Sequence, residues 1–247
     1  MCTIVLAWRA FPDAAVAVAA NRDESPDRPS SAPAVRGGDP AVLAPRDERA
    51  GGTWMGVNDR GLFVTLANRW RDADVEGERS RGLLVEDVLA AGSVEEASDV
   101  VREAVAAARY EGFTLLVADE SAARLLVWTD GLAVFDLDPG VHVVVNVGHD
   151  GTYDVPERRR EVGERQAANA DHIRDTLAPA ASEDAQEWLH RAGEVLADHE
   201  YGACLHHSRY GTVSSSLVAI GADGSVDWRY ADGPPCRTDY RPVDGQI

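Results

Sequence analysis

Residues 16–24 read Val-Ala-Val-Ala-Ala-Asn-Arg-Asp-Glu, an apolar run that stops abruptly at four polar residues. The apolar run predicts a β-strand, and charged side chains at the end of a strand lie at the rim of a sheet. Arg22 and Asp23 are suited to hold a thiolate there, because a guanidinium lowers a thiol pKa and a carboxylate can accept a proton or orient an amine. A salt-bridged strand end is the alternative interpretation of the same pair.

The N-terminus supplies a thiol for that pair, because Cys2 directly precedes a second apolar strand, Thr3–Leu6. Removal of Met1 would leave Cys2 with a free α-amine beside its own thiol. The amine titrates near pKa ~8 and the thiol near ~8.5, so both lie within reach of neutral pH. N-terminal nucleophiles of this kind catalyse acyl transfer. A small buried cysteine without chemistry is the plainer alternative.

These two segments open a longer series of motifs. The series continues with Arg28-Pro29, Gly51-Gly52-Thr53-Trp54, Gly56-Val57, Arg60-Gly61, Asn68, Gly112-Phe113, Asn146 and Tyr210-Gly211-Thr212. In this order and spacing the motifs resemble the NRDE-motif family, the transport and Golgi organisation family of eukaryotes, from the first residue to about Tyr230. The resemblance implies a single NRDE-family domain over residues 1–247.

More distantly, the arrangement resembles the cysteine N-terminal-nucleophile (Ntn) hydrolases, which include bile-salt hydrolases and penicillin V acylases. That resemblance implies an α+β fold, a four-layer αββα sandwich with mainly antiparallel sheets. It also implies a cysteine nucleophile, an arginine and an aspartate from the following strand, two oxyanion asparagines and a later arginine. In this sequence these roles fall on Cys2, Arg22, Asp23, Asn68, Asn146 and Arg158, with Arg159 and Arg160 as alternatives for the last.

One departure from the hydrolase pattern concerns Arg22 and Asp23, which are adjacent here and separated by a residue or two in the hydrolases. Neighbours on a regular strand face opposite ways, so both serve Cys2 only if the strand ends or bulges there. Asn68 and Asn146 each follow a predicted strand, where N–H donors can be aimed at one point; an Asx turn is the alternative. The candidate substrate-binding residues are Asn21, Glu24, Thr53 and Trp54.

The predicted elements are strands interrupted by pairs of helices. The strands are Thr3–Leu6, Val16–Ala20, Trp54–Val57, Leu62–Leu66, Phe113–Ala118, Arg124–Thr129, Leu132–Leu137, Val141–Val145, Gly211–Ile220 and Ser225–Tyr230. The helices are Gly82–Ala91, Ser93–Arg109, Pro156–Asp175 and Glu183–Asp198. We expect the first four strands to bring Cys2, Arg22 and Asn68 into one sheet, and the next strands to form a second.

Local signals refine this plan. Ser93 and Glu96 form a capping box, and Ser182 is expected to open the last helix. The stretch Ser25–Ala50 is rich in proline, aspartate and arginine. It predicts an irregular segment that serves as a lid or pocket wall.

Composition limits the partners. Among 247 residues, 42 are acidic and 24 basic, and the net charge is −18; all the basic residues are arginine. Such acidity opposes binding to nucleic acid or to an anionic membrane surface. It favours a salt-adapted, halophilic protein, whereas a high-GC genome would explain only the missing lysine. Without a leader pattern or an apolar run of ~20 residues, we expect a cytoplasmic protein with no stable membrane insertion.

The three cysteines, at positions 2, 204 and 236, are an odd number without close pairing, so we expect reduced thiols and no disulfide framework. Cys204 lies near His199 and the pair His206-His207. This group lacks paired ligand spacing. It therefore predicts a polar loop near the pocket, and no metal is expected.

Three functions remain open. In the first, Cys2 hydrolyses an amide or related acyl bond of a small molecule and needs no cofactor. In the second, the fold carries a hydrophobic ligand, because the resemblance to eukaryotic proteins linked with haem mobilisation and lipid homeostasis implies haem or an acyl lipid. The candidates for an axial haem ligand are Cys2, His142, His149, His206 and His207. The third is a structural or interaction domain. Substrate identity and oligomeric state are not specified by the sequence.

Overall fold

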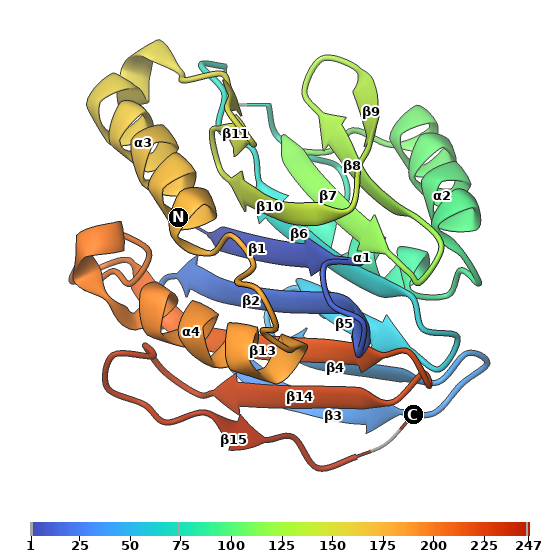
Figure 1. Cartoon of the computed structure of the whole chain (residues 1–247). Helices are drawn as coiled ribbons and strands as arrows, with labels where there is room; N and C mark the ends of the chain where they lie inside the picture. The colour runs from blue at the N-terminus through green and yellow to red at the C-terminus, as the bar shows by residue number, and fades with distance from the viewer. Residues whose placement is uncertain (1, 74, 246) are drawn as a thin grey trace. The chain divides into compact units, whose positions relative to one another are not determined.

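The chain folds into two compact units, each built on one antiparallel sheet (Figure 1). The computed structural model describes residues 2–73, 75–245 and 247. The first unit contains the chain up to Asp27 together with Pro139–Val243, and the second contains Arg28–Asp138 with the last residues. The chain therefore leaves the first unit after the NRDE segment and returns to it for the second half.

The first unit contains an eight-stranded sheet in the order β12-β11-β10-β1-β2-β13-β14-β15. Its strands are β1 (Thr3–Trp8), β2 (Ala14–Glu24), β10 (Gly140–Val145), β11 (Gly148–His149), β12 (Thr152–Tyr153), β13 (Gly211–Gly221), β14 (Val226–Ala231) and β15 (Arg241–Pro242). All neighbours are antiparallel, and Thr3 of β1 lies opposite both Asn21 of β2 and Val145 of β10. The central position of β1 and β2 explains why both are buried along nearly their whole length.

Two helices, α3 (Arg160–Thr176) and α4 (Ala185–Ala197), pack on this sheet, α3 against β10 and α4 against β2 and β13 (Figure 1). Short 3-10 turns, Glu157–Arg159 and His199–Tyr201, precede α3 and follow α4. Fully buried Trp188 anchors α4 by donating from Nε1 to the Leu177 carbonyl at 2.8 Å. The unit thus has a helical layer on the sheet that carries the N-terminus.

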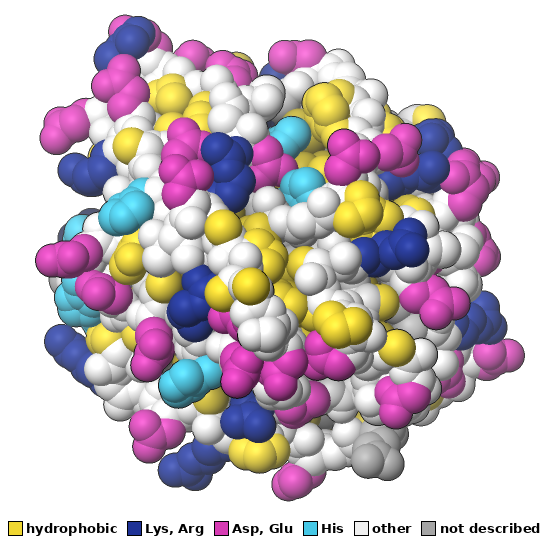
Figure 2. All heavy atoms as spheres, in the orientation of Figure 1, with side chains coloured by type: hydrophobic (Ala, Val, Ile, Leu, Met, Phe, Trp, Pro, Cys, Tyr) yellow, Lys and Arg dark blue, Asp and Glu magenta, His cyan; other side chains and the backbone are white. Residues whose placement is uncertain are grey.

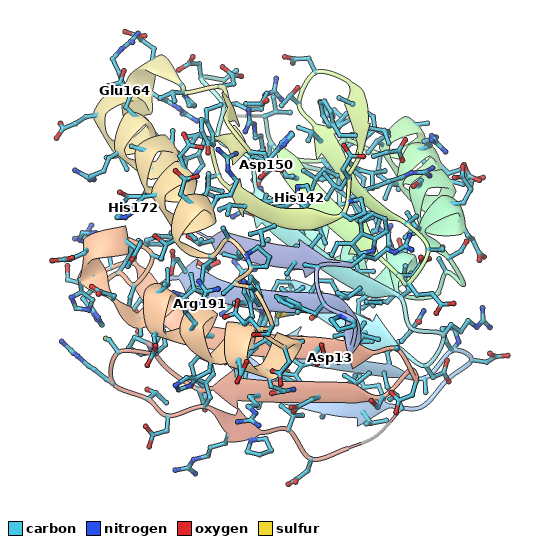
Figure 3. The ribbon with its side chains drawn as sticks, in the orientation of Figure 1. Asp13, His142, Asp150, Glu164, His172 and Arg191 are labelled. Atoms are coloured by element: carbon cyan, nitrogen blue, oxygen red, sulfur yellow. The ribbon has the colours of Figure 1, made fainter. Side chains whose placement is uncertain are left out.

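The cap of α4 differs from the predicted one. Asp184, not Ser182, is its N-cap, because the Asp184 carboxylate accepts the N–H of Glu187 at 2.8 Å while Glu187 accepts the N–H of Asp184. The carboxylate of Asp13, just before β2, also accepts the N–H of Ala185 at 3.3 Å (Figure 3). A negatively charged group at the first turn is favourable because the helix dipole makes the N-terminus partly positive.

The second unit contains a seven-stranded sheet in the order β3-β4-β5-β6-β7-β8-β9. Its strands are β3 (Ser30–Arg36), β4 (Val42–Asp47), β5 (Met55–Asn58), β6 (Phe63–Asn68), β7 (Phe113–Ala118), β8 (Ala123–Trp128) and β9 (Leu132–Asp136). The helices α1 (Arg81–Val88) and α2 (Val94–Ala107) bury Leu84, Val88 and Val101 against this sheet. Ser93 caps α2 as predicted, because its hydroxyl accepts the N–H of Glu96 at 3.2 Å. The Glu96 carboxylate, which in a capping box would accept the N–H of Ser93, accepts that of Gly92 instead.

The predicted assignment of strands to sheets was wrong. β5 and β6 do not join β1 and β2, because both edges of the β1–β2 hairpin are taken by distant strands, β10 and β13. β5 and β6 instead share a sheet with β7, β8 and β9. Cys2 and Arg22 therefore lie in a different sheet from Asn68.

Ser25–Ala50 is also more regular than predicted, since it contains the hairpin of β3 and β4. β3 is an edge strand with a register shift between Ser31 and Ala34. Pro33 lies within that shift, where its missing N–H breaks no regular pairing. Val35, in the same strand, is 41% exposed, so β3 lacks the alternation of buried and exposed side chains that is typical of a half-buried strand.

Acidic side chains are spread over the face drawn in Figure 2, with arginines among them rather than in a separate patch. Many arginines of the described residues pair with carboxylates, as Arg191 does with Glu183 at 2.7 Å and Arg36 with Glu86 at 2.6 Å. Across the described ranges, no helix has the length and apolar character needed to cross a bilayer.

Candidate active site

Cys2 is held by its main chain. Its nitrogen donates to Oδ1 of Asn146 at 3.0 Å, and the same oxygen accepts from Nε2 of Gln166 at 3.1 Å. The β1–β10 register explains this contact, because Thr3 lies opposite Val145 and so places the preceding and following residues side by side. Asn146 is only 1% exposed. Its carbonyl oxygen is thus fixed from α3 and directed at the nitrogen that would become the α-amine.

The thiol of Cys2 points to the end of β2. Its Sγ lies 3.9 Å from the main-chain oxygen of Asp23. Burial raises the pKa of the thiol above its usual value, and the positive charge of Arg22 opposes this shift only in part. The resting thiol is therefore protonated at neutral pH, and a base must remove its proton before it attacks a carbonyl.

The Asp23 carboxylate is buried, with 4% of the residue exposed, and accepts a hydrogen bond of 2.5 Å from the Thr212 hydroxyl. Burial raises the pKa of Asp23 to about 6, although the Thr212 hydrogen bond acts in the opposite direction. A carboxyl group with this pKa exchanges a proton near neutral pH. Asp23 can therefore take part in proton movement beside Cys2.

Arg22 and Asp23 face an irregularity in the neighbouring strand. Asp23 pairs with Thr212 and Arg22 with Ser214, so β13 has one extra residue, Val213, between the two pairs. The bulge thus lies in β13 and not in β2, the strand that carries Arg22 and Asp23, which continues to Glu24. A bulge twists the sheet locally and re-aims side chains, and here both Arg22 and Asp23 are buried.

The family model described as Transport and Golgi organisation 2 matches residues 1–229. The chain belongs to this family. Its Bos taurus homologue, Transport and Golgi organization protein 2 homolog, is 27% identical over 235 residues, 85% of this chain and 83% of the bovine protein. The Homo sapiens homologue is 26% identical over 238 residues, with the same shares covered.

Solved structures show the fold. The Caenorhabditis elegans ortholog of N-acylethanolamine-hydrolyzing acid amidase superimposes with a TM-score of 0.57 and 16% identity, covering 87% of this chain and 92% of its own. Penicillin V acylase from Agrobacterium tumefaciens gives a TM-score of 0.51 and 14% identity, covering 95% and 92%. The predicted Ntn-hydrolase-type fold, with mainly antiparallel sheets, is confirmed.

Asn21, the first residue of the NRDE motif, has a defined place in this family member. Its Nδ2 donates to the carbonyls of Leu196 at 2.9 Å and Ala203 at 3.0 Å. The side chain thereby links β2 to the end of α4 and to the loop that follows it. Glu24 accepts the N–H of Ser25 at 2.8 Å. The substrate-binding role given to both residues remains a prediction.

The remaining predicted residues lie elsewhere. Asn68 ends β6 of the second unit, as predicted, and pairs with Phe113. Thr53 is buried beside Trp54 in the same unit and donates to the Met55 carbonyl at 2.8 Å. Arg158 is exposed in the turn Glu157–Arg159 of the first unit. Met1 lies outside the described residues, so its removal remains a prediction.

The structure brings together Cys2, Arg22, Asp23 and Asn146, and it adds two residues that sequence reasoning missed. Thr212 and Gln166 hold the functional groups of Asp23 and Asn146. Gln166 carried a usable signal, because it is a polar residue on the buried face of α3, together with Gly163 and Ala170. Thr212 belongs to the family motif Tyr210-Gly211-Thr212, which by itself assigns it no role.

Proposed function

We propose that this protein is a cysteine Ntn hydrolase that cleaves an amide or related acyl bond of a small molecule. The observation that carries the proposal is the double anchoring of Cys2. Its nitrogen binds Asn146 Oδ1 at 3.0 Å while its sulfur lies 3.9 Å from the Asp23 carbonyl. The two atoms that such a mechanism requires, amine and thiol, thus belong to a residue whose backbone is fixed.

In the proposed reaction, the free α-amine of Cys2 removes the thiol proton and the thiolate attacks the acyl carbon. The C–N bond breaks, the leaving amine takes that proton, and a thioester remains on Cys2. Water then attacks the thioester, giving the carboxylic acid and the free thiol. Asn146 orients the amine through Oδ1. Asp23 accepts or returns a proton.

The test compares two forms of one protein, one with Met1 removed and one with Met1 retained, each verified by intact mass. They differ in whether the free α-amine belongs to Cys2 or to Met1. We expect the Met1-free form to hydrolyse a member of a panel containing penicillin V, an N-acylethanolamine and simple N-acyl amides. The retained form and Cys2→Ala should be inactive. Equal turnover by Cys2→Ala would contradict the proposed nucleophile.

A trapped intermediate provides a second readout. With a slowly hydrolysed acyl substrate, the mass of the Met1-free protein should increase by one acyl group, and Cys2→Ala should show no increase. If the Met1-free protein neither turns over the panel nor forms the adduct, the family's trafficking context favours carriage of a hydrophobic ligand. In that case Cys2→Ala should bind haem or an acyl lipid as the parent protein does.

A further inference from the structure

Four further side chains of the first unit converge on one point: His199, Cys204, His206 and Cys236. One potential ligand atom from each lies within 4.8 Å of all the others. The sulfurs of Cys204 and Cys236 are 3.5 Å apart, and His206 Nε2 lies 3.6 Å from the first and 3.1 Å from the second. The rings of His199 and His206 lie 5.1 Å apart between centroids.

We propose that these four residues bind a tetrahedral transition-metal ion, with Zn²⁺ as the natural occupant. Two thiolates and two imidazoles are a ligand set of closed structural zinc sites. Bonds of about 2.3 Å to sulfur and about 2.0–2.1 Å to nitrogen place tetrahedral ligand atoms about 3.4–3.8 Å apart. The observed separations of 3.1, 3.5 and 3.6 Å are close to this range, so small side-chain adjustments are enough to bind the ion.

The ligands come from three segments, which explains why sequence spacing predicted no metal. His199 belongs to the 3-10 turn after α4, Cys204 and His206 to the following loop, and Cys236 to the segment between β14 and β15. Cys204 and Cys236 are 32 positions apart. The short Cys-x-His spacing becomes part of a four-ligand set only when the C-terminal segment folds back onto the loop.

A disulfide between Cys204 and Cys236 is the competing use of these thiols. A disulfide bond has a sulfur separation of about 2.05 Å. Here the sulfurs are 3.5 Å apart, and both cysteines are free. A disulfide also gives no role to the two histidines, whereas a metal uses all four groups. The histidine contacts therefore favour a metal over a disulfide.

The cluster adjoins the backbone that supports the candidate active site. The Ala203 carbonyl, directly before Cys204, accepts from Asn21 at 3.0 Å. The Leu205 N–H, directly after it, donates to the Thr212 hydroxyl at 2.9 Å. Thr212 in turn donates to Asp23. An ion bound by Cys204 and His206 would fix the loop that orients these groups, so we assign it a structural role.

The test uses the full chain carrying Cys2→Ser, so that Cys204 and Cys236 are the two remaining thiols. The protein is reduced, freed of metal and titrated with Co²⁺ without oxygen. We expect one Co²⁺ per chain, with the intense visible bands of a four-coordinate site and thiolate-to-cobalt charge transfer in the near ultraviolet. One equivalent of Zn²⁺ should abolish both signals, because Zn²⁺ binds such sites more tightly than Co²⁺.

Three variants in this background identify the ligands: Cys236→Ser, His206→Ala and, as a matched control, His207→Ala. The first two should weaken Co²⁺ binding by more than about a hundredfold, since losing even an outer-shell partner costs ten- to a hundredfold. His207→Ala should bind as the parent does. His206 is exposed, so His206→Ala tests the site even if Cys236→Ser fails to fold.

Two results would overturn the proposal. One is a reduced protein that binds no Co²⁺, or binds it without thiolate charge transfer. The other is equal affinity in His206→Ala, His207→Ala and the parent. If mass spectrometry of the isolated protein also showed a Cys204–Cys236 link, the cluster would be a disulfide site instead.

Discussion

Asp23 should make the free energy of unfolding depend on pH, and Asp23→Asn should remove that dependence. Burial raises the pKa of Asp23 from 3.8 to about 6. Between pH 3.8 and about pH 6, the folded protein therefore keeps a proton on Asp23 that the unfolded chain has lost. The stabilising contribution of this protonation is full below pH 3.8 and is lost as the pH rises through about 6. The difference between the two pKa values corresponds to about 3 kcal/mol.

Asparagine is neutral at every pH and keeps an oxygen that can accept the Thr212 hydroxyl. We therefore expect Asp23→Asn to exceed the parent in unfolding free energy by about 2 kcal/mol more at pH 7 than at pH 4, less than the full difference because pH 4 lies above the unfolded pKa of 3.8. Urea unfolding of both proteins at pH 4, 5, 6 and 7 measures this double difference, in which the other carboxylates cancel. Hydrolysis by the variant should fall at the same time, because its side chain cannot accept a proton.

The control for this measurement is Asp175→Asn, on an exposed position of α3. Its effect should stay within about 0.5 kcal/mol at every pH, as for other surface substitutions. If the difference between Asp23→Asn and the parent were the same at pH 4 and pH 7, the Asp23 carboxylate would not be destabilised by burial. The reasoning about its proton would then be refuted.

Three further outcomes are expected. Gln166→Leu removes the 3.1 Å hydrogen bond to Asn146 and should lower kcat about tenfold with little change in KM, the equivalent of about 1.4 kcal/mol; an unchanged kcat would exclude this positioning role. Gly52→Ala places a Cβ 2.2 Å from the Gly82 carbonyl carbon and should destabilise the protein by about 3 kcal/mol or more in urea unfolding. The control Gly51→Ala, at φ +78° with open space around it, should cost only about 1–2 kcal/mol, and equal costs would contradict a steric overlap at Gly52. Raising NaCl from 0.1 to 1 M shortens the Debye length from ~10 to ~3 Å and should raise Tm, because repulsion within a chain of net charge −18 is screened; a constant or falling Tm would contradict this.

Local pattern was sufficient to predict the four α-helices and ten of the strands, but not the pairing of distant segments. The β1–β2 hairpin was predicted because two apolar runs follow each other closely in the chain. The pairing of Thr3 with Val145 has no local signal, since it joins segments far apart in the sequence. For the same reason the distribution of hairpins between the two sheets was wrong. β3 and β4 were missed because both lie in the proline-rich stretch Ser25–Ala50, and a proline within a short run argues against a strand.

The candidate site divides in the same way. Cys2, Arg22 and Asp23 were found because each lies in a short motif whose chemistry is recognisable from the residue types. Thr212 was not given a role, because its hydrogen bond to Asp23 spans 189 positions and depends on the extra residue in β13. Cys236 was left out of the histidine cluster because its 3.1 Å contact with His206 exists only after the C-terminal segment folds back.

The chain of contacts through Thr212 predicts that metal occupancy changes the titration of Asp23. Leu205 donates to the Thr212 hydroxyl, which leaves that hydroxyl's own proton for the carboxylate. The Thr212 hydrogen bond lowers the pKa of Asp23. Releasing the ion should loosen the loop and weaken this hydrogen bond, so the pKa of Asp23 should rise. The pH midpoint of the stability difference between the parent and Asp23→Asn should then rise by about one pH unit, because a hydrogen bond to a charged group is worth about 1.5 kcal/mol or more. In a Thr212→Val background the midpoint should be high with or without Zn²⁺. If Zn²⁺ left the midpoint of the parent unchanged, the two sites would be energetically independent despite their shared loop.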